Sequence, residues 1–224
     1  MSDSLQRLQK TLGYEFSDQG LLQLALSHRS CGARNNERLE FLGDSVLNHV
    51  ITEALFEAFP LAREGELSRM RASLVKGETL AKVAREFALG EYIRLGSGEK
   101  KSGGHRRDSI QADCLEALIG AMLLDSDIGQ CRSRVLAWFA QRLETISPEL
   151  TEKDAKTQLQ EFLQGRGKAL PEYSLLRVEG EDHNQEFTVQ CRVSGHESAF
   201  EGVGSSRRKA EQAAAQAALE LLND

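Results

Sequence analysis

Apolar residues recur every three or four positions along most of the first 146 residues, which is the spacing of one face of an α-helix. The pattern predicts a series of amphipathic helices joined by short polar or glycine-containing connections. Their expected ranges are 5–12, 19–26, 38–59, 66–74, 78–87, 108–124 and 128–145. This part of the chain is therefore expected to be all helical.

The pattern changes after residue 146. The segment 147–153 lacks apolar periodicity and contains Pro148, so it is expected to be a linker between domains 1–146 and 154–224. The second domain is expected to have the order α-β-β-β-α. The predicted helices are 154–164 and 205–222, and the predicted strands are centred on 172–179, 186–194 and 197–203.

Three carboxylates lie at the start of the predicted helix 38–59. Glu37, Glu40 and Asp44 fall at i, i+3 and i+7, so they share one narrow stripe of the helix. The stripe borders core-type residues such as Leu39, where carboxylates repel one another and resist desolvation. A bound cation would relieve both effects, although a solvated acidic face is the alternative.

A second acidic pair, Asp113 and Glu116, interrupts the otherwise apolar helix 108–124 on one side. Together the two segments favour a cage of four carboxylates, in which Glu40 and Asp44 face Asp113 and Glu116. Hard oxygen ligands suit Mg²⁺, and Mn²⁺ is expected to substitute. Such a site indicates metal-assisted phosphodiester hydrolysis, with a second ion left open.

The segment 36–45 resembles the signature of bacterial ribonuclease III, the endonuclease of double-stranded RNA. The similarity also covers residues 63–71 and 95–116 and continues into the C-terminal region, so it spans essentially the whole chain. It implies an all-α catalytic domain with the ribonuclease III endonuclease fold, followed by a small α+β double-stranded-RNA-binding domain.

The resemblance also implies roles for seven residues. The implied metal ligands are Glu40, Asp44, Asp113 and Glu116, the implied catalytic residues are Asp44, Glu116, Glu37 and Glu64, and the implied dimer contact is Phe41. It further implies a homodimer formed through the catalytic domain. Each of its two sites would cut one RNA strand and leave 5′-phosphate and 3′-hydroxyl ends with short 3′ overhangs.

Composition places limits on the partners. The net charge of −6 argues against a generic nucleic-acid binder, so RNA binding must come from local basic clusters. The apolar stretches are too short to span a bilayer, and the first residues are expected not to be a signal peptide because they contain no apolar core. The four cysteines are scattered without metal-ligand spacing, so we expect reduced thiols in a cytoplasmic protein without a membrane partner.

One basic cluster lies in the glycine-rich segment 95–107, which is expected to be a loop because its glycines mark loops and not strands. Its cationic residues are Lys100, Lys101, Arg106 and Arg107. Because no strand precedes the segment, a phosphate-binding loop of the nucleotide-binding type is disfavoured. A contact with the RNA backbone is favoured over a mobile surface loop.

The other basic cluster opens the last predicted helix, where Gly204 to Ser206 form a cap-and-turn signal and Arg207, Arg208 and Lys209 follow. Cations at a helix N-terminus interact unfavourably with the helix dipole. An anion bound there would accept hydrogen bonds from the free backbone N–H groups and would also neutralise the basic side chains. Solvated basic residues are the alternative. Ser205 is included among the expected RNA contacts.

Polar residues on the first helix of the second domain could reach 2′-hydroxyls in the minor groove of A-form RNA. They are Thr157, Gln160, Glu161 and Gln164. The α-β-β-β-α order resembles a double-stranded-RNA-binding domain, and this resemblance implies that His183 enters a second minor groove.

The sequence therefore predicts a Mg²⁺-dependent endoribonuclease of double-stranded RNA, and the resemblance implies that it processes ribosomal RNA precursors and other structured transcripts. Two other classes stay open. One is a binding-only regulator whose catalytic fold serves for dimerisation, which the complete carboxylate set disfavours. The other is a hydrolase of small phosphate esters, for which residues 153–224 would bring no benefit.

Overall fold

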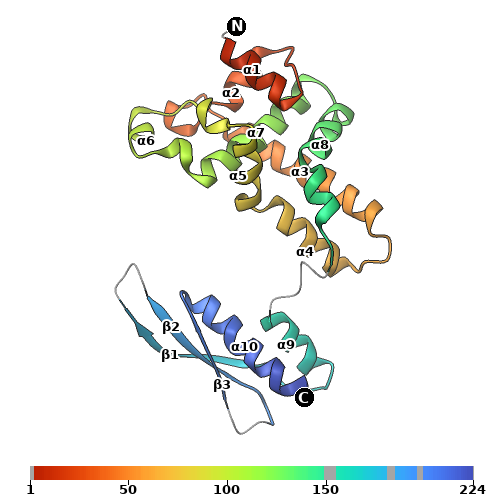
Figure 1. Cartoon of the computed structure of the whole chain (residues 1–224), viewed down its shortest axis with the longest axis vertical. Coiled ribbons are helices and arrows are strands. Elements are labelled where there is room, and N and C mark those ends of the chain that lie inside the picture. Colours follow the sequence, from red (N-terminus) through yellow and green to blue (C-terminus); the bar gives the residue numbers. More distant parts are fainter. Residues whose placement is uncertain (1–2, 149–154, 181–184, 196–198, 224) are drawn as a thin grey trace. The chain divides into compact units, whose positions relative to one another are not determined.

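The computed structural model describes residues 3–148, 155–180, 185–195 and 199–223. The chain forms two compact units, residues 1–151 and residues 152–224 (Figure 1). Each unit has its own hydrophobic core. The two are therefore described separately.

The described part of the first unit is helical, as the apolar pattern predicts. Its longer helices are α1 (Asp3–Leu12), α2 (Gln19–Ala25), α3 (Glu37–Ala58), α4 (Glu64–Val75), α5 (Gly77–Glu86), α7 (Asp108–Asp125) and α8 (Ile128–Thr145). Most ends lie within one or two residues of the predicted ones. Asp18 caps α2 by accepting a hydrogen bond from the backbone N–H of Gly20 at 2.7 Å, so this predicted helix start is confirmed.

Helix α7 lies at the centre of the first unit and packs against α2, α3, α5 and α8 (Figure 1). Most of its residues from Ile110 to Met122 are buried. Because α7 is covered on several sides, its apolar residues follow no single stripe, as expected for a buried helix. Charged side chains on such a helix need a specific explanation.

Two glycines allow α3 and α7 to cross with their backbones in contact. A Cβ atom on Gly43 of α3 would overlap the carbonyl oxygen of Glu116, and one on Gly120 of α7 would overlap the carbonyl oxygen of Leu39. This close crossing brings the acidic positions of the two helices together.

The prediction that 95–107 is entirely a loop is wrong. The segment contains a short helix, α6 (Ser97–Lys101), and a 3-10 turn, η3 (Gly104–Arg106). Another 3-10 turn, η2 (Leu89–Glu91), precedes them, and η1 (Arg29–Cys31) follows α2. Gly98 was expected to break helical structure, but it lies in open space within α6, where a single glycine is tolerated.

The second unit has the predicted α-β-β-β-α order: α9 (Ala155–Gln164), β1 (Glu172–Glu179), β2 (Glu186–Arg192), β3 (Phe200–Gly204) and α10 (Arg207–Asn223). The sheet is antiparallel in the order β1-β2-β3, with Glu179 opposite Glu186 and Cys191 opposite Phe200. Helix α10 packs on β2, β3 and α9 (Figure 1). Strand β2 ends two residues earlier than predicted, and residues 196–198, at the predicted start of the third strand, lie outside the described part.

Candidate metal centre and RNA-binding surfaces

Three carboxylates from two helices meet in the first unit. Glu40 of α3 and Asp113 and Glu116 of α7 each place an oxygen so that all three atoms lie within 4.8 Å of one another. All three side chains are half-buried. The i, i+3 spacing within α7 puts Asp113 and Glu116 on one side of that helix, and the glycine crossing brings Glu40 to the same place.

The carboxyl groups strongly perturb one another. Burial, followed by the charges of Asp44, Asp113 and Glu40, raises the pKa of Glu116 to about 8. Burial and the nearby Asp113 and Glu37 also raise the pKa of Glu40. A proton on Glu116 therefore relieves the repulsion that a bound cation would otherwise relieve.

The pKa of Asp113 is raised as well, chiefly by burial, while His28 and Arg29 oppose that shift. Arg29 also forms an exposed ion pair with Glu37, at 3.8 Å between the guanidinium and the carboxylate. Arg29 is therefore a cation beside the cluster, but its charge does not cancel the rise in the pKa values of Glu40 and Asp113.

Asp44, Glu37 and Glu64 lie outside the three-residue group. Asp44 is exposed, accepts a hydrogen bond from Asn48 at 2.8 Å, and acts on Glu116 through its charge. Glu64 is also exposed and accepts from the hydroxyl of Ser68 at 2.7 Å. The structure thus brings together three of the four predicted metal ligands most closely, with Asp44 as a charged neighbour.

Buried polar residues that the sequence patterns did not single out support the cluster. The Asn36 amide donates to the carbonyl of Ala25 at 3.2 Å, and its backbone N–H donates to the carbonyl of Ser27 at 2.8 Å. The thiol of Cys114 donates to the same Ala25 carbonyl at 3.7 Å. These contacts hold the segment after α2 between the start of α3 and the acidic turn of α7.

His28 belongs to this same segment and is buried. Its Nδ1 accepts the backbone N–H of Ser30 at 3.2 Å and lies 2.8 Å from the Ser30 hydroxyl. The Ser30 hydroxyl in turn accepts the backbone N–H of Gly96 at 2.9 Å. The neighbours of His28 in the sequence, Arg29 and Ser30, show no apolar periodicity. The position of His28 near the acidic cluster is therefore known only from the fold.

The donor set fits a divalent metal. All three clustered side chains offer carboxylate oxygens, which are hard ligands. Because burial and repulsion disfavour the ionised carboxylates, a bound cation would stabilise them. Among the described residues, neither cysteine nor histidine takes part in this group. The cluster could therefore hold a divalent cation.

Large apolar side chains are exposed on α3 and on the turn that follows it. Phe41, near the start of α3, is 78% exposed, and Phe56 in its last turn and Leu61 in the following turn are also largely exposed. A hollow of about 480 Å³ is lined by residues of both helices and the turn between them. They are Thr52, Leu55, Phe56, Ala62, Glu64, Leu67, Ser68 and Arg71. Large exposed apolar groups around a hollow are typical of contact surfaces.

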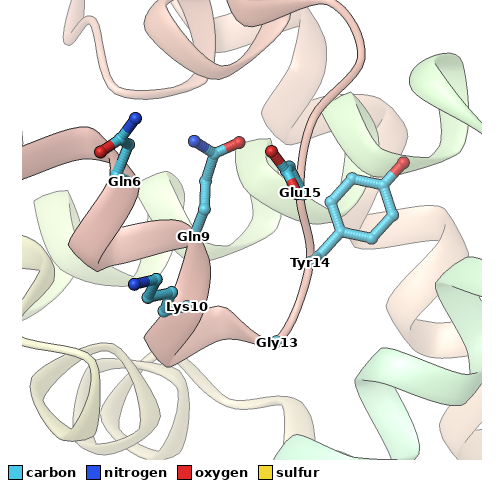
Figure 2. A pocket seen from close by; sticks show the side chains of 6 residues that line it. All are labelled: Gln6, Gln9, Lys10, Gly13, Tyr14 and Glu15. Atoms are coloured by element: carbon cyan, nitrogen blue, oxygen red, sulfur yellow. The ribbon is translucent and has the colours of Figure 1, made fainter. Parts of the chain in front are cut away.

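A second hollow, of about 450 Å³, lies at the end of α1 (Figure 2). Gln6, Gln9 and Lys10 line it from the helix, and Gly13, Tyr14 and Glu15 line it from the following turn. The Tyr14 hydroxyl donates to Asp125 at 2.8 Å, which ties this turn to the end of α7. Its lining contains none of the clustered carboxylates.

The basic residues of segment 95–107 are exposed. Arg107 forms an ion pair with Glu99 at 2.8 Å, which leaves it less available than its neighbours. Lys100, Lys101 and Arg106 carry no ion pair within the described residues. They are the positive groups of this segment that remain available to an anion.

The second unit presents two polar surfaces. Thr157, Gln160, Glu161 and Gln164 are exposed on α9, opposite the buried Leu159 and Leu163. Arg207, Arg208 and Lys209 occupy the first turn of α10, as predicted, and are exposed. Ser206 accepts the backbone N–H of Lys209 at 3.3 Å, and Ser205 accepts from the Lys209 ammonium at 3.0 Å. His183 lies outside the described residues.

Cysteine usage and hydropathy agree with the expectations from sequence. All four cysteines are free thiols. No helix in the described ranges combines the length and apolar character needed to cross a membrane.

Comparison with known families matches both units. The family model for Ribonuclease-III-like proteins matches residues 18–143. The family model for the double-stranded RNA binding motif matches residues 155–222. The second unit is therefore a double-stranded-RNA-binding domain.

Comparison with individual proteins gives the same result. The chain is 58% identical over 224 residues to Ribonuclease 3 of Vibrio parahaemolyticus, covering 100% of both chains. The crystal structure of the nuclease domain of ribonuclease III from Campylobacter jejuni is 39% identical, with a TM-score of 0.62 over 65% of this chain and 100% of that one. A second structure of that domain, described for flexibility in a region involved in dimer formation, is 41% identical and has a TM-score of 0.60 over 61% of this chain and 96% of that one. The chain therefore belongs to the ribonuclease III family of double-stranded-RNA endoribonucleases.

Proposed function

We propose that the chain is a Mg²⁺-dependent ribonuclease III that hydrolyses phosphodiesters of double-stranded RNA and leaves 5′-phosphate and 3′-hydroxyl ends. The observation that carries this proposal is the half-buried group of Glu40, Asp113 and Glu116. A binding-only regulator has no use for three carboxylates whose burial raises their pKa values, with a further rise at Glu40 and Glu116 from the neighbouring carboxylates.

Glu40, Asp44, Asp113 and Glu116 are the proposed metal ligands. When bound there, a divalent cation supplies positive charge that polarises a phosphodiester and acidifies water. The carboxylates hold that cation and must lose the Glu116 proton to do so. Asp44 and Glu116 are proposed to act in catalysis with Glu37 and Glu64, the other carboxylates of the catalytic valley.

Mg²⁺ is proposed because the donor atoms are carboxylate oxygens and leave room for water and a phosphate oxygen. Mn²⁺ prefers similar ligands and is expected to substitute for it. A site that selected zinc would be expected to contain cysteine or histidine.

The RNA-contacting residues are proposed to lie in both units. In the nuclease unit they are Lys100, Lys101, Arg106 and Arg107; in the binding unit they are Thr157, Gln160, Glu161, Gln164, His183, Ser205, Arg207, Arg208 and Lys209. Exposure of the described members supports this proposal. We further propose that residues 1–146 form the catalytic domain, 154–224 the binding domain and 147–153 the linker between them.

We also propose a homodimer formed through the catalytic domain, with Phe41 as a contact. The support is the exposed ring of Phe41 and the apolar hollow of α3 and α4. The flexible dimer-forming region named for the Campylobacter domain is consistent with this assignment. Two such sites, each cutting one strand, would give short 3′ overhangs.

The biological setting proposed is the cytoplasm, with ribosomal RNA precursors and other structured transcripts as substrates. The free thiols support a reducing compartment. Recognition of A-form shape by the binding domain supports structured RNA as a class of substrate.

Glu116→Gln tests the catalytic assignment. The substitution keeps the size of the side chain but removes the charge, so RNA cleavage in Mg²⁺ should fall by orders of magnitude. Binding of an RNA duplex, measured without divalent metal, should stay near the wild-type value. The products of the wild-type protein, mapped at both ends, should carry 5′-phosphates and 3′-hydroxyls.

Glu91→Gln is a suitable control because Glu91 is exposed in η2, outside the acidic group. Retained cleavage by Glu116→Gln, or joint loss of cleavage and RNA binding, would refute the role given to Glu116. Cleavage by the wild-type protein in the presence of a chelator would refute the metal requirement.

A further inference from the structure

A buried carboxylate links the two helices of the binding unit. Glu211 lies one turn into α10, and its side chain is only 14% exposed. It accepts a hydrogen bond from the Lys156 ammonium of α9 at 2.6 Å and another from Nε of Arg207 at 3.0 Å. One carboxylate thus holds a cation of α9 and a cation of the first turn of α10.

The position of Glu211 is unexpected for a surface that binds phosphate. A carboxylate near the start of α10 repels the phosphate that the helix N-terminus and its arginines attract. It is nevertheless ionised, because the hydrogen bond from Lys156 lowers the pKa of Glu211, with a further contribution from Arg207. Because the charge of Glu211 opposes phosphate binding, we expect a contribution of Glu211 to structure or to RNA binding that offsets this repulsion.

On the side of α9, the contact is structural. The Lys156 ammonium also lies over the Tyr173 ring, 4.5 Å from its centroid. The backbone N–H of Lys156 donates to the side chain of Gln212 at 3.1 Å. Lys156 therefore anchors the start of α9 to α10 and β1, and Glu211 sits at the centre of this anchor.

On the side of α10, the hydrogen bond from Arg207 to Glu211 fixes the orientation of the guanidinium. The arginine side chain is 60% exposed, and a free side chain of this length would sample many rotamers. Because Glu211 takes Nε, the plane of the guanidinium is set while its two terminal nitrogens remain for another acceptor. A phosphate is the acceptor whose geometry suits that pair of nitrogens.

We propose that Glu211 is a positioning residue for RNA binding: anchored by Lys156, it orients the guanidinium of Arg207 toward an RNA phosphate. The inference rests on the proposed function, in which Arg207 contacts RNA. It adds that affinity depends on an acidic residue that itself makes no favourable contact with the RNA.

The proposal reverses the sign that charge alone predicts. If Glu211 were merely a negative charge near RNA, Glu211→Gln would strengthen binding. If Glu211 orients Arg207, the same substitution weakens binding, because a neutral amide holds the guanidinium less tightly than a carboxylate. The expected loss is about three- to ten-fold, because the substitution replaces a charge-assisted hydrogen bond with a neutral one that is roughly half as strong.

The experiment is a double-mutant cycle in the full chain. Affinity for a fixed RNA duplex is measured with a chelator present, so that cleavage does not interfere, for wild type, Glu211→Gln, Arg207→Ala and the double variant. Glu220→Gln removes the same charge from an exposed position of α10 and serves as the matched control. Glu211→Gln should weaken binding in the Arg207 background and not in the Ala background.

Other outcomes overturn the inference. Stronger binding by Glu211→Gln would show a charge effect only, and an equal loss in both Arg207 backgrounds would show an effect on the fold. If Arg207→Ala leaves affinity unchanged, the place of Arg207 in the proposed function falls together with this inference. Absence of RNA binding by the wild-type chain would refute the proposed function itself.

Arg207→Lys covers the case in which Glu211→Gln fails to fold. Lysine keeps the charge at an exposed position but cannot use one nitrogen for Glu211 while presenting two to a phosphate. It should therefore bind RNA more weakly than the wild type, by about the same factor as Glu211→Gln. Wild-type affinity for Arg207→Lys would overturn the positioning role.

Discussion

In the absence of divalent metal, the nuclease unit should become less stable as the pH rises from 5.5 to 8.5, and Glu116→Gln should remove most of that loss. The pKa of Glu116 is raised from its ordinary value of 4.5 to about 8 by burial and by Asp44, Asp113 and Glu40. Between those two values the folded chain keeps a proton that the unfolded chain has lost. Stability is therefore fully retained below 4.5 and falls until the pH passes about 8.

The size of the effect follows from the two pKa values. Each unit of pKa difference is worth about 1.36 kcal/mol, and the assay spans the part of the interval from pH 5.5 to about 8, which corresponds to roughly 3 kcal/mol. The Glu116 side chain is only half-buried, and water screens part of the repulsion, so about 1–2 kcal/mol is the expected loss. For a unit of this size the melting temperature should fall by roughly 2–8 °C.

Trp138 provides the assay, because it is the only tryptophan of the chain and is buried in the nuclease unit. Melting is followed by its fluorescence at both pH values with a chelator present. The upper pH stays below 9.0, the ordinary pKa of cysteine, because burial raises the pKa of Cys114 to about 12 and would add a loss of the same sign. Adding Mg²⁺ or Mn²⁺ at pH 8.5 should restore stability to the wild type and much less to Glu116→Gln.

The comparison with Glu91→Gln decides whether the reasoning holds. That variant removes an exposed carboxylate of the same unit, so its pH dependence should match the wild type. If Glu116→Gln loses as much stability between the two pH values as the wild type does, burial and repulsion at Glu116 are not the cause. A rise of stability with pH in the wild-type chain would refute the sign.

Three further predictions concern packing, assembly and RNA contact. Gly43→Ala should destabilise the nuclease unit by roughly 1–3 kcal/mol in chemical denaturation, because its Cβ would overlap the backbone of α7. Gly77→Ala should show no such loss, because a Cβ at Gly77 would lie in open space. Equal stability of the two variants would contradict the close crossing of α3 and α7. Phe41→Ala should shift the chain toward monomer in analytical ultracentrifugation, since its ring is 78% exposed, and an unchanged mass distribution would remove Phe41 from the interface. Replacing both Lys100 and Lys101 with Ala should reduce the slope of log RNA affinity against log salt concentration by an amount that corresponds to about two phosphate contacts. An unchanged slope would show that these two lysines do not contact RNA.

Much of the fold could be predicted because the helices are long and their apolar periods are regular. The ends of α8 and β1 coincide with the predicted ranges, and the α-β-β-β-α order of the second unit is confirmed. Short elements were missed where glycine dominates the local pattern. Helix α6 has local backbone hydrogen bonds, such as that from Lys100 to Gly96, but the bond from the Gly96 N–H to the Ser30 hydroxyl is a tertiary contact that local composition does not contain.

The acidic residues of the candidate site could be found because two of them interrupt α7, a helix that is otherwise buried. Periodicity placed Asp113 and Glu116 on one side of that helix, but it contains no information on which other helix lies there. The pairing with Glu40 came from the economy of a shared metal site and from the family resemblance. The distance between the helices and the different exposure of Asp44 required the structure.

The residues that build the site without touching metal or RNA were the hardest to recognise. Gly43 and Gly120 each occupy a point where any side chain would separate α3 from α7, and no local pattern in the sequence marks them. Glu211 is one of 34 acidic residues in the sequence, and its low exposure and its two cations set it apart from Glu220 on the same helix. In both cases the sequence shows the residue type, while the function depends on what lies across the interface between two helices. The assignments most in need of mutational tests are therefore at these helix contacts.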